Sequence, residues 1–445
     1  MQLSVWGTAP VRDVSLNKMK SCAEGEWDVV VVGAGAAGLA AAARCLARGR
    51  TVVCLEANPQ RAGGRARSEQ WDGAVVELGA ELLHGSSICT RELAERFGHP
   101  VDSLARFAHL RYGAERSNGA RMYAALERLR EEAELQPGSL LDYLVQAGVV
   151  TSPADREEAD ILLAQTWCCA VERLAAADVQ QELQGDCSGS HELEGRLPRG
   201  FSALLEEMAR GVSVQLGARV TSLREEPAAE GTGSGTRLVA RTADGCAFVA
   251  QRAAVVAVAA PLLQTIDFGA AIDDRLELVR RWVRMEPATK LVYQLEQCPW
   301  DADTTYLAAP QLFCRWWVGR PSDRLLVCYV TAGRAAEVDA MPEAEALREG
   351  LAQVAPLLGV DPRQLRAVRA VRQSWAREAG VGGGYCSVLP GAPHDIRQRL
   401  FEPCGRLFFA GEHTAFFSNP QTVHGAIDSG TRAADLLCQG TQATI

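Results

Sequence analysis

The sequence predicts an α/β protein in which a domain built from three separated segments encloses an inserted mixed α+β domain. Two observations support this prediction. Residues 27–56 read as a strand, a tight turn, a helix and a second strand, within the length of one crossover unit. Strand-rich blocks at 27–85, 199–270 and 375–445 alternate with helix-rich blocks, and no internal repeat is visible. A chain of 445 residues is long enough for two or three domains.

The changes in pattern also suggest where the domains begin and end. The helix-rich blocks between the strand-rich ones read as insertions into one domain rather than as independent domains that follow one another along the chain. The expected ranges are a flexible lead-in at 1–25, a three-segment domain at 26–85, 199–270 and 375–445, and an inserted domain at 86–198 and 271–374.

Composition excludes several classes of protein. Hydrophobic residues make up 47% and charged residues 23%, which is ordinary for a globular chain. The net charge of -9 argues against nucleic-acid binding and agrees with a cationic partner. The longest apolar run, Ala253–Ala260, is far shorter than the ~18–20 residues of a membrane span, and no export signal opens the chain. The 14 cysteines are scattered without a Cys-x-x-Cys, so we expect no metal site and a cytoplasmic, reducing location.

The first predicted strand is Trp27–Val32, whose continuous β-branched run is typical of a strand buried on both faces. Ala36–Arg48 is rich in Ala and Leu and reads as a helix, and Thr51–Leu55 reads as the next strand. The later elements, in chain order, are a helix at Met122–Leu135 ended by Pro137-Gly138, a hairpin at Asp244-Gly245, a buried strand at Ala253–Ala260, a short strand at Leu407–Gly411 and a helix at Thr422–Cys438.

The turn after the first strand carries Gly33-x-Gly35-x-x-Gly38, and Glu56 ends the following strand. The glycines allow the backbone to approach a pyrophosphate at the helix N-terminus, and the acid can accept hydrogen bonds from ribose hydroxyls. In the order strand, turn, helix and strand, this pattern predicts a Rossmann-like dinucleotide-binding domain. The alternative is a glycine-rich turn without a ligand.

A second glycine pair follows in Arg61-Ala62-Gly63-Gly64-Arg65. Gly64 again permits close backbone approach, and Arg65 can offset phosphate charge. A surface turn with a solvated arginine is the alternative interpretation.

Together, these stretches resemble the N-terminal FAD fingerprint of the flavin-dependent amine oxidase family, which includes monoamine oxidases, polyamine oxidases and lysine-specific histone demethylases. Residues 76–85, Val-Glu-Leu-Gly-Ala-Glu-Leu-Leu-His-Gly, are similar to the polyamine oxidase version. The resemblance implies that Glu81 and Leu82 face the flavin and that His84 lies at the substrate channel. For His84, a buried structural histidine is the alternative.

Further blocks that resemble this family are spread along the chain in the family's order. They are Leu197–Phe201 with Gly217–Val220, Ala288–Val292, Trp375 with Gly384-Tyr385, Phe409–Thr414, and Thr422–Ala426. By resemblance, the FAD-binding residues are Gly33, Gly35, Gly38, Glu56, Gly64, Arg65, Glu81, Leu82, Val220, Trp375, Gly411, Glu412, Thr422 and Val423. The stretch 86–196 carries almost no recognisable pattern.

Some of these residues also have a physical interpretation. Thr422 and Val423 open a predicted helix after Pro420, so their N–H groups are available to a flavin carbonyl. Lys290 lies on an apolar strand, where a charge is unexpected unless it is paired or functional. In the family this lysine holds a water next to flavin N5; a solvent-facing edge-strand lysine is the alternative. Tyr385 is expected to align the amine, with a structural tyrosine as the alternative.

Three positions depart from the family pattern. The loop at 57–62 is one residue longer, and Asn58 replaces a common arginine, which leaves the pyrophosphate to Arg61 or Arg65. Gly384 stands where monoamine oxidases carry the flavin-linked cysteine, so we expect non-covalent FAD. Asn419 stands where an aromatic residue often closes the substrate cage. The aromatic residues that could compensate are Phe416, Phe417, Trp316 and Trp317.

The resemblance implies oxidation of an amine to an imine and then an aldehyde plus a shorter amine, with O2 reduced to H2O2. Lys290, His84 and Tyr385 are the expected catalytic residues. Polyamines, free or acetylated, are the favoured substrates because of the His84-Gly85 match and the acidic residues Glu81, Glu192 and Glu194.

Three alternatives remain open at this stage. An L-amino-acid or monoamine oxidase is one, and Arg315 or Arg320 is then the expected carboxylate clamp. A histone demethylase-like enzyme is the second, although only 26 residues precede the first predicted strand, which leaves no expected room for a docking module. A flavin-binding scaffold without oxidase activity is the third.

Overall fold

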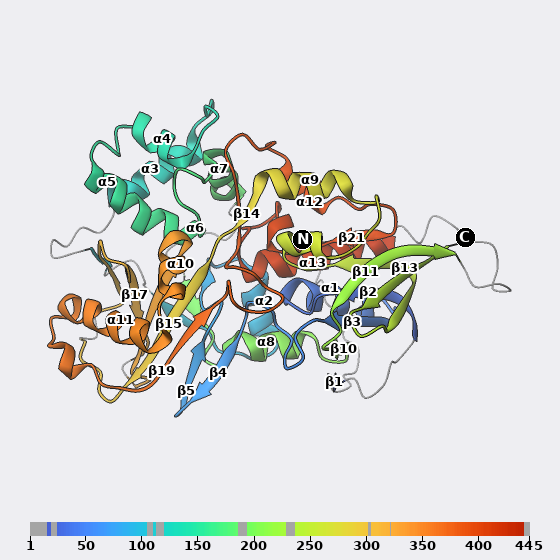
Figure 1. Ribbon diagram of the computed structural model, residues 1–445, viewed down its shortest axis with the longest axis horizontal. Helices are drawn as coiled ribbons and strands as arrows, with labels where there is room; N and C mark the ends of the chain where they lie inside the picture. The colour runs from blue at the N-terminus through green and yellow to red at the C-terminus, as the bar shows by residue number, and fades with distance from the viewer. Residues whose placement is uncertain are drawn as a thin grey trace.

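The computed structural model describes residues 16–18, 25–104, 110–112, 120–185, 194–227, 236–300, 304–320 and 322–439. The two main sheets lie in different halves of the molecule, with helices packed on each (Figure 1). The half with the six-stranded sheet has one buried hydrophobic cluster, and the eight-stranded sheet has one on each of its faces. The predicted α/β class and the mixed α+β second domain are confirmed.

The first sheet has eight strands and contains the predicted glycine-turn unit. Five of its strand pairings are parallel, and the two at the β11 edge are antiparallel. Val29, Val30 and Val31 in the centre are fully buried, as expected for a strand covered on both faces. The strand order is β1 (Leu16–Lys18), β10 (Ser213–Leu216), β3 (Val52–Glu56), β2 (Gly25–Val32), β13 (Ala247–Val256), β12 (Thr236–Thr242) and β11 (Val220–Pro227), with β21 (Leu407–Phe409) also on β13.

Helices α1 (Ala36–Ala47), α8 (Gly200–Met208) and α13 (Val423–Gln439) lie on the same side of the molecule as this sheet (Figure 1). Helix α1 packs closely on α13, and a Cβ built at Gly430 would lie 2.1 Å from the carbonyl oxygen of Ala37. An Arg44–Asp435 ion pair of 2.8 Å joins the two helices. Small residues therefore bring the C-terminal helix against the helix that follows the glycine turn.

The second sheet has six strands and lies in the other half. Its strand order is β19 (Ala367–Ser374), β15 (Ala288–Leu295), β18 (Leu325–Thr331), β17 (Arg315–Val318), β16 (Tyr306–Ala308) and β8 (Leu110–Tyr112). The helices of this half are α3 (Ala120–Glu131), α4 (Leu140–Gln146), α5 (Pro153–Ala159), the π-helical turn η2 (Asp160–Ala164), α6 (Gln165–Trp167), α7 (Ala176–Gly185), α10 (Ala332–Ala340) and α11 (Glu343–Leu358).

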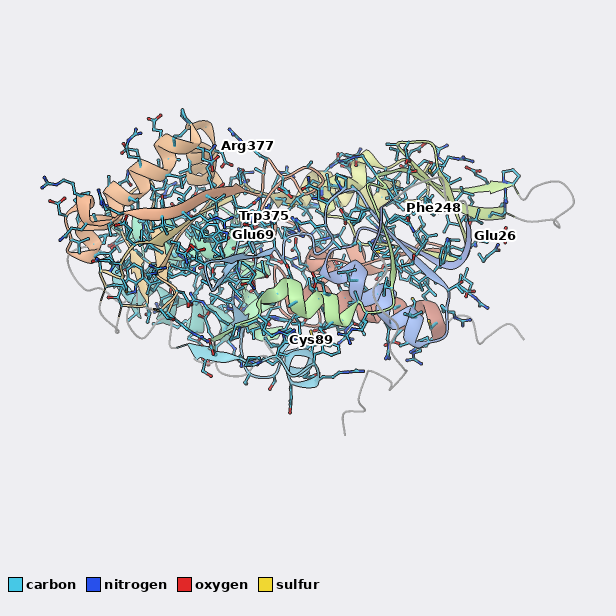
Figure 2. All side chains as sticks on the ribbon, turned by 90° about the horizontal axis from the view of Figure 1, so that it is seen from below. Glu26, Glu69, Cys89, Phe248, Trp375 and Arg377 are labelled. Carbon is cyan, nitrogen blue, oxygen red and sulfur yellow. The ribbon has the colours of Figure 1, made fainter. Side chains whose placement is uncertain are left out.

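Three small sheets and several short helices complete the described chain. The small sheets are β4 (Ser68–Trp71) with β5 (Ala74–Glu77), β6 (Leu83–His84) with β9 (Glu194–Arg196) and β7 (Asp102–Leu104), and β14 (Val283–Met285) with β20 (Cys386–Val388). The remaining helices are α2 (Cys89–Arg96), η3 (Ala260–Thr265), α9 (Asp273–Trp282), η4 (Pro362–Gln364), α12 (Ile396–Phe401) and η5 (Glu412–Thr414). Figure 2 labels Trp375 near the middle of the molecule, and Phe248 and Glu26 toward the end that carries the eight-stranded sheet.

Element positions follow the sequence pattern with some differences. The hairpin at Asp244-Gly245 joins β12 to β13, as predicted. The lead-in at 1–25 is not wholly loose, because Leu16–Lys18 pairs in parallel with β10 at the edge of the large sheet. Residues 1–15 and 19–24 of the lead-in lie outside the described residues. Among the helices described, none combines the length and the apolar composition needed to cross a bilayer.

Candidate active site

A cavity of about 1240 Å³ lies between the two halves and is lined by residues from both. Every residue predicted to bind FAD or to act in catalysis lines it, with the single exception of Gly38. The cavity therefore joins the glycine turn of the first sheet to the polar face of the second. It extends to Glu127 on α3 and Glu182 on α7, in the stretch where the sequence carried no pattern.

The glycine turn is shaped by backbone contacts that leave no room for side chains at Gly33 and Gly38. Gly33 has φ +98°, in the left-handed region that favours glycine. A Cβ at Gly38 would lie 1.8 Å from the carbonyl oxygen of Gly33, so this glycine supports the turn from behind the cavity. Gly35 faces the second glycine pair, and a Cβ at Gly64 would lie 3.1 Å from its Cα. The two turns form a backbone-lined cradle at the N-terminus of α1.

Glu56 is held at the end of β3 by two backbone N–H groups. Its carboxylate accepts from the N–H of Ala34 and from the N–H of Asn58, each at 2.8 Å. Burial raises its pKa above the ordinary value, against the opposing effect of these two bonds. The carboxylate lines the cavity at the position predicted for a ribose contact.

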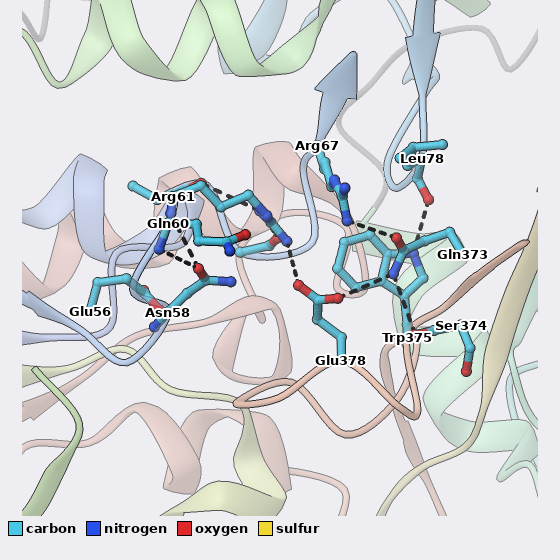
Figure 3. Close-up of polar contacts among 12 residues, drawn as sticks. Glu56, Asn58, Gln60, Arg61, Arg67, Leu78, Gln373, Ser374, Trp375 and Glu378 are labelled. Carbon is cyan, nitrogen blue, oxygen red and sulfur yellow. Dashed lines mark hydrogen bonds and ion pairs between the residues drawn. The ribbon is translucent and has the colours of Figure 1, made fainter. Parts of the chain in front are cut away.

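The longer loop after Glu56 has its own internal support. The Oδ1 atom of Asn58 accepts from the N–H groups of Gln60 and Arg61, which closes the loop as an Asx turn (Figure 3). Arg61 donates to the carbonyl of Gly64 at 2.8 Å and pairs with Glu378 at 3.1 Å. Asn58 thus fixes the loop, where the family pattern has a charged arginine.

Trp375 packs beneath this loop as a buried wall of the cavity. Its indole N–H donates to the carbonyl of Leu78 at 3.1 Å (Figure 3). A Cβ at Gly79 would lie 2.8 Å from the indole ring, so the glycine allows the ring to pack against the turn. The tryptophan therefore connects the loop of the first domain to the end of β19.

Arg65 has two polar partners within the protein. Its guanidinium pairs with Glu412 at 2.8 Å and donates to the carbonyl of Gly384 at 2.6 Å. Burial alone would raise the pKa of Glu412, but Arg65 and the neighbouring cations hold it below the ordinary value. Arg65 also lines the cavity, and its contact with a phosphate stays a prediction.

The N-terminus of α13 faces the same cavity. Thr422 caps the helix, since its hydroxyl accepts from the N–H of Gly425 at 3.0 Å and donates to the carbonyl of Asn419 at 2.7 Å. The first N–H groups of a helix have no partner inside it, and those of Thr422 and Val423 are at the end that lines the cavity. Gly411 and Glu412 line the cavity from the adjoining turn.

Lys290 is buried on β15 and is ion-paired. Its ammonium lies 2.8 Å from a carboxylate oxygen of Glu81 and donates to the carbonyl of Glu77 at 3.1 Å. Only 3% of the residue is exposed, and β15 lies between β18 and β19. The alternative of a solvent-facing edge-strand lysine is therefore wrong.

Glu81 also binds two further groups from other elements. It pairs with Arg196 of β9 at 2.9 Å and accepts from the indole N–H of Trp317 at 2.9 Å. Burial would raise its pKa, but Lys290 and Arg196 lower it below the ordinary value, so the carboxylate is charged at neutral pH. The role of Arg196 could not be predicted, because nothing in the sequence shows that β6 and β9 pair.

His84 lies at the cavity wall with its side chain 46% exposed. Its Nδ1 is 3.1 Å from a carboxylate oxygen of Glu194, the residue opposite it on β9. This exposure excludes the alternative of a buried structural histidine. Glu192, the third acidic residue expected to favour a polyamine, lies outside the described residues.

Tyr385 is oriented by a chain of hydrogen bonds. The hydroxyl of Tyr329 donates to that of Tyr385 at 2.8 Å, and Tyr385 donates to the carbonyl of Thr166 at 2.7 Å. Burial raises the pKa of Tyr385, so its phenol is neutral. The π-helical turn η2 and the left-handed Cys168 lie on either side of the helix that carries Thr166. No sequence motif marks Tyr329 or Thr166, whose roles follow from these two hydrogen bonds.

The four aromatic residues proposed to compensate for Asn419 lie in different places. Trp317 and Asn419 both line the cavity. Trp316 instead points to the other face of β17 and packs on Tyr293 in the core. Phe416 and Phe417 pack together against Phe401 and do not line the cavity. Trp317 is thus the one candidate in position to contact a substrate.

Cys386, Glu412 and His413 form a buried cluster whose ligand atoms lie within 4.8 Å of one another. Glu412 in this cluster is already paired with Arg65. The guanidinium of Arg397 donates to the backbone carbonyls of Cys386 and His413. Two guanidinium groups at one cluster disfavour a metal cation there.

The glycine cradle, the helix N-termini and the cavity with a buried, ion-paired lysine define an α/β enzyme that holds a dinucleotide cofactor against a second, substrate-binding domain. Residues 176–438 match the family described as flavin containing amine oxidoreductase, and residues 31–97 match the NAD(P)-binding Rossmann-like domain. The chain belongs to the flavin-containing amine oxidoreductase family and is an FAD-dependent amine oxidoreductase.

Curated relatives agree with this assignment. The chain is 25% identical to polyamine oxidase 2 of Arabidopsis thaliana, over 92% of this chain and 87% of that protein. It is 26% identical to the peroxisomal N(1)-acetyl-spermine/spermidine oxidase of Bos taurus, over 92% and 94%. A lysine-specific histone demethylase 1 homolog 3 of Arabidopsis thaliana is 24% identical over 94% of this chain but only 30% of its own length.

Solved structures share the fold. A putrescine oxidase bound to putrescine matches with a TM-score of 0.77 at 20% identity, covering 93% of this chain and 99% of that chain. The cyclohexylamine oxidase of Brevibacterium oxydans matches with a TM-score of 0.79 at 16% identity, covering 94% and 100%. At these identities the likeness concerns the fold alone.

The residues of this chain fit FAD. The cradle of Gly33, Gly35 and Gly64 is open to the cavity. A Cβ at Gly33 would lie 2.9 Å from the carbonyl oxygen of Ala257, and Gly64 has φ +59°, in the left-handed region that favours glycine. The acid of Glu56 and the N-terminus of α13 lie along the same cavity. These are the donors and acceptors that a pyrophosphate, a ribose and a flavin carbonyl require.

Proposed function

We propose that this chain oxidises a polyamine, free or acetylated, to an imine that hydrolyses to an aldehyde and a shorter amine, with O2 reduced to H2O2. One observation carries the choice of a polycation. Seven glutamates line the cavity, together with aromatic residues that include Trp317, Tyr329 and Tyr385. Besides Glu56, Glu378 and Glu412, which belong to the predicted cofactor turns or pair with them, these are Glu81, Glu127, Glu182 and Glu194. Spaced carboxylates match a substrate with several ammonium groups better than a monoamine.

Bound FAD supplies the two-electron acceptor for this reaction. The chain's own residues position the amine. The ring of Tyr385 is fixed by its bond to the carbonyl of Thr166, and it forms a wall against which an alkyl amine can lie. The Glu194 carboxylate orients His84, which is exposed enough to accept a proton from the substrate ammonium. Lys290 holds a water at the buried side of the cavity.

We also propose that FAD is held without a covalent bond. A Cβ built at Gly384 would lie 2.6 Å from the Cβ of Ala288 and 2.8 Å from the sulfur of Cys168. This crowding leaves no space for a side chain at the position of the flavin-linked cysteine. Cys386 is buried against Glu412. Denaturation should therefore release all of the FAD into the supernatant after acid precipitation, whereas FAD that stays with the protein contradicts this proposal.

An amine screen tests the proposed substrate class. Purified FAD-bound protein is assayed for peroxide with spermine, spermidine, acetylated spermine, putrescine, a monoamine and L-amino acids. We expect the highest kcat/KM with a polyamine. The variant Glu127→Gln should raise KM for spermine about tenfold with a smaller change in kcat, because it removes one carboxylate of the wall without touching the His84–Glu194 pair. Equal kcat/KM for monoamines and polyamines would exclude the proposed specificity.

An L-amino-acid oxidase remains the second candidate because Arg315 lines the cavity. Its guanidinium donates to the hydroxyl of Thr166 at 2.9 Å, beside Tyr385. Arg320, the other arginine expected as a carboxylate clamp, is paired with Asp102 and does not line the cavity. Peroxide formation with an L-amino acid that is lost in Arg315→Met would favour this second activity.

A further inference from the structure

Lysine is rare in this chain, which makes its presence at position 290 informative. Of 46 basic residues only three are lysines, namely Lys18, Lys20 and Lys290, and the rest are arginines. Arginine stays charged in proteins, whereas lysine loses its proton readily when burial disfavours the charge. The charge of Lys290 therefore depends on what surrounds it.

The surroundings of Lys290 contain one close carboxylate. Glu81 lies 2.8 Å from its ammonium, and the carbonyl of Glu77 accepts a second bond. The neighbours on the adjoining strands are Tyr329 on β18 and Gln373 on β19, and burial keeps the Tyr329 phenol neutral by raising its pKa. The Trp317 ring centroid lies 5.3 Å from the ammonium.

Two other ionisable groups act on this pair. Arg196 shares the Glu81 carboxylate at 2.9 Å and brings a second positive charge into the cluster. The Glu77 carboxyl accepts from Ser68 and from the N–H of Phe201, and burial raises its pKa to about 7. Glu77 is therefore only partly ionised at neutral pH, and Glu81 is the main counter-charge for both cations.

Glu81 lies between two cavities. A second cavity of about 50 Å³, large enough for water, lies behind it and is lined by Arg196, Glu77 and Asp323. Glu81 is the residue common to the linings of the two cavities. Its carboxylate separates the main cavity from the small one, and both cations are held on it.

We infer that Glu81 is a positioning residue: its carboxylate keeps the Lys290 side chain positively charged and fixed at the cavity wall, in competition with Arg196. This inference deepens the proposed function, since it rests on Lys290 lying beside the bound FAD. Without Glu81, two cations would face each other in a buried site. Arginine cannot release its proton there, so the lysine must.

Nuclear magnetic resonance of lysine-labelled protein tests this directly, because only three lysine signals are present. FAD-bound protein with ¹³Cε,¹⁵Nζ-lysine is titrated from pH 6 to 10, and Lys290→Arg identifies the Lys290 signal. We expect Lys290 to stay an ammonium in the wild type. In Glu81→Gln its proton affinity should fall at least tenfold, so that the loss of the proton moves into the measured range.

A second substitution distinguishes the charge effect from general damage to the site. In Glu81→Gln combined with Arg196→Met, one of the two cations is gone, and we expect Lys290 to regain most of the lost proton affinity. Glu81→Asp, which keeps the negative charge, should keep Lys290 an ammonium across the titrated range. The matched control is Glu69→Gln, which changes a carboxylate on β4 outside the cluster and should leave the Lys290 signal unaltered.

Reoxidation by O2 of chemically reduced, FAD-bound protein gives a second measurement that needs no amine. In Glu81→Gln its rate should acquire a pH dependence that follows the Lys290 titration. The inference is overturned if Lys290 titrates identically in the wild type and Glu81→Gln, or if removing Arg196 restores nothing. A negative amine screen would instead overturn the proposed function and leave the titration result standing.

Discussion

Lys290 combines burial, an ion pair and a place on the cavity wall. Because Glu81 keeps Arg196 as a counter-charge when the lysine is removed, Lys290→Met should fold and bind FAD. We expect turnover with the best amine to fall by roughly 10²-fold, the size of effect typical for a positioned proton-handling group. Stopped-flow reduction and reoxidation of the flavin would locate the loss. Unchanged turnover and reoxidation would remove Lys290 from the mechanism.

His413 gives a pH-dependent contribution to stability. Burial lowers its pKa to about 4, below the ordinary value of about 6.5. Between these values the unfolded chain binds more protons than the folded one, so stability falls as the pH drops from 6.5 to 4. The loss attributable to this residue is roughly 3 kcal/mol.

Chemical unfolding at pH 7 and pH 4.5 would measure this effect. The variant His413→Gln should lose less stability on acidification than the wild type does. His394→Gln, at an exposed histidine, is the matched control and should follow the wild-type curve. Parallel curves for wild type and His413→Gln would contradict the assignment.

Single residues could be predicted from sequence where their role is local. Glu56 follows a strand at a fixed distance from a glycine turn, and Lys290 stands out on an apolar strand. Tyr329 and Arg196 could not be predicted, because their roles depend on the register between β15 and β18 and between β6 and β9. The pairing of Arg65 with Glu412 could not be predicted either, because the two residues are 347 positions apart in the sequence.

At the scale of elements, the contact between α1 and α13 holds both helix N-termini at the cavity. A Cβ at Gly430 would meet the backbone of Ala37 at 2.1 Å, whereas one at Gly333 on α10 would meet nothing within 4 Å. We expect Gly430→Ala to destabilise the protein by about 1–3 kcal/mol through overpacking and to weaken FAD binding. Thermal unfolding with and without FAD would measure both effects.

Gly333→Ala is the matched control for this prediction. Both positions are in helices, where alanine is favoured over glycine by roughly 0.5–1 kcal/mol, so Gly333→Ala should be neutral or slightly stabilising. If Gly430→Ala and Gly333→Ala had equal stability, close packing of α1 on α13 would not be the reason for a glycine at position 430.

Elements with continuous signals could be predicted well from the sequence. The valine run of β2, the hairpin before β13 and the final helix are local patterns that need no tertiary information. The short strands β6 and β9, and the π-helical turn η2, could not be predicted. They contain too few residues for a periodic pattern, and they form because distant segments pack against them.

At the scale of the whole molecule, the cavity depends on contact between the two halves. A buried Arg397–Asp178 pair of 2.8 Å joins α12 to α7. Segments far apart in the sequence, including the turn at Gly33, the strand at Lys290 and the helix at Val423, line one space. The α/β class could be predicted from the strand-rich blocks. The contribution of 120–185 to the cavity could not, because its helices carry only ordinary apolar patterning.

The central claim is that this cavity holds FAD beside a site for an amine. Anaerobic mixing of the purified yellow protein with spermine or spermidine, followed by its visible spectrum, tests it most directly. We predict that the oxidised-flavin band is bleached in a single turnover and returns on admission of O2, with one H2O2 formed per flavin. A protein that binds FAD but keeps the oxidised spectrum with every amine tested would contradict the account.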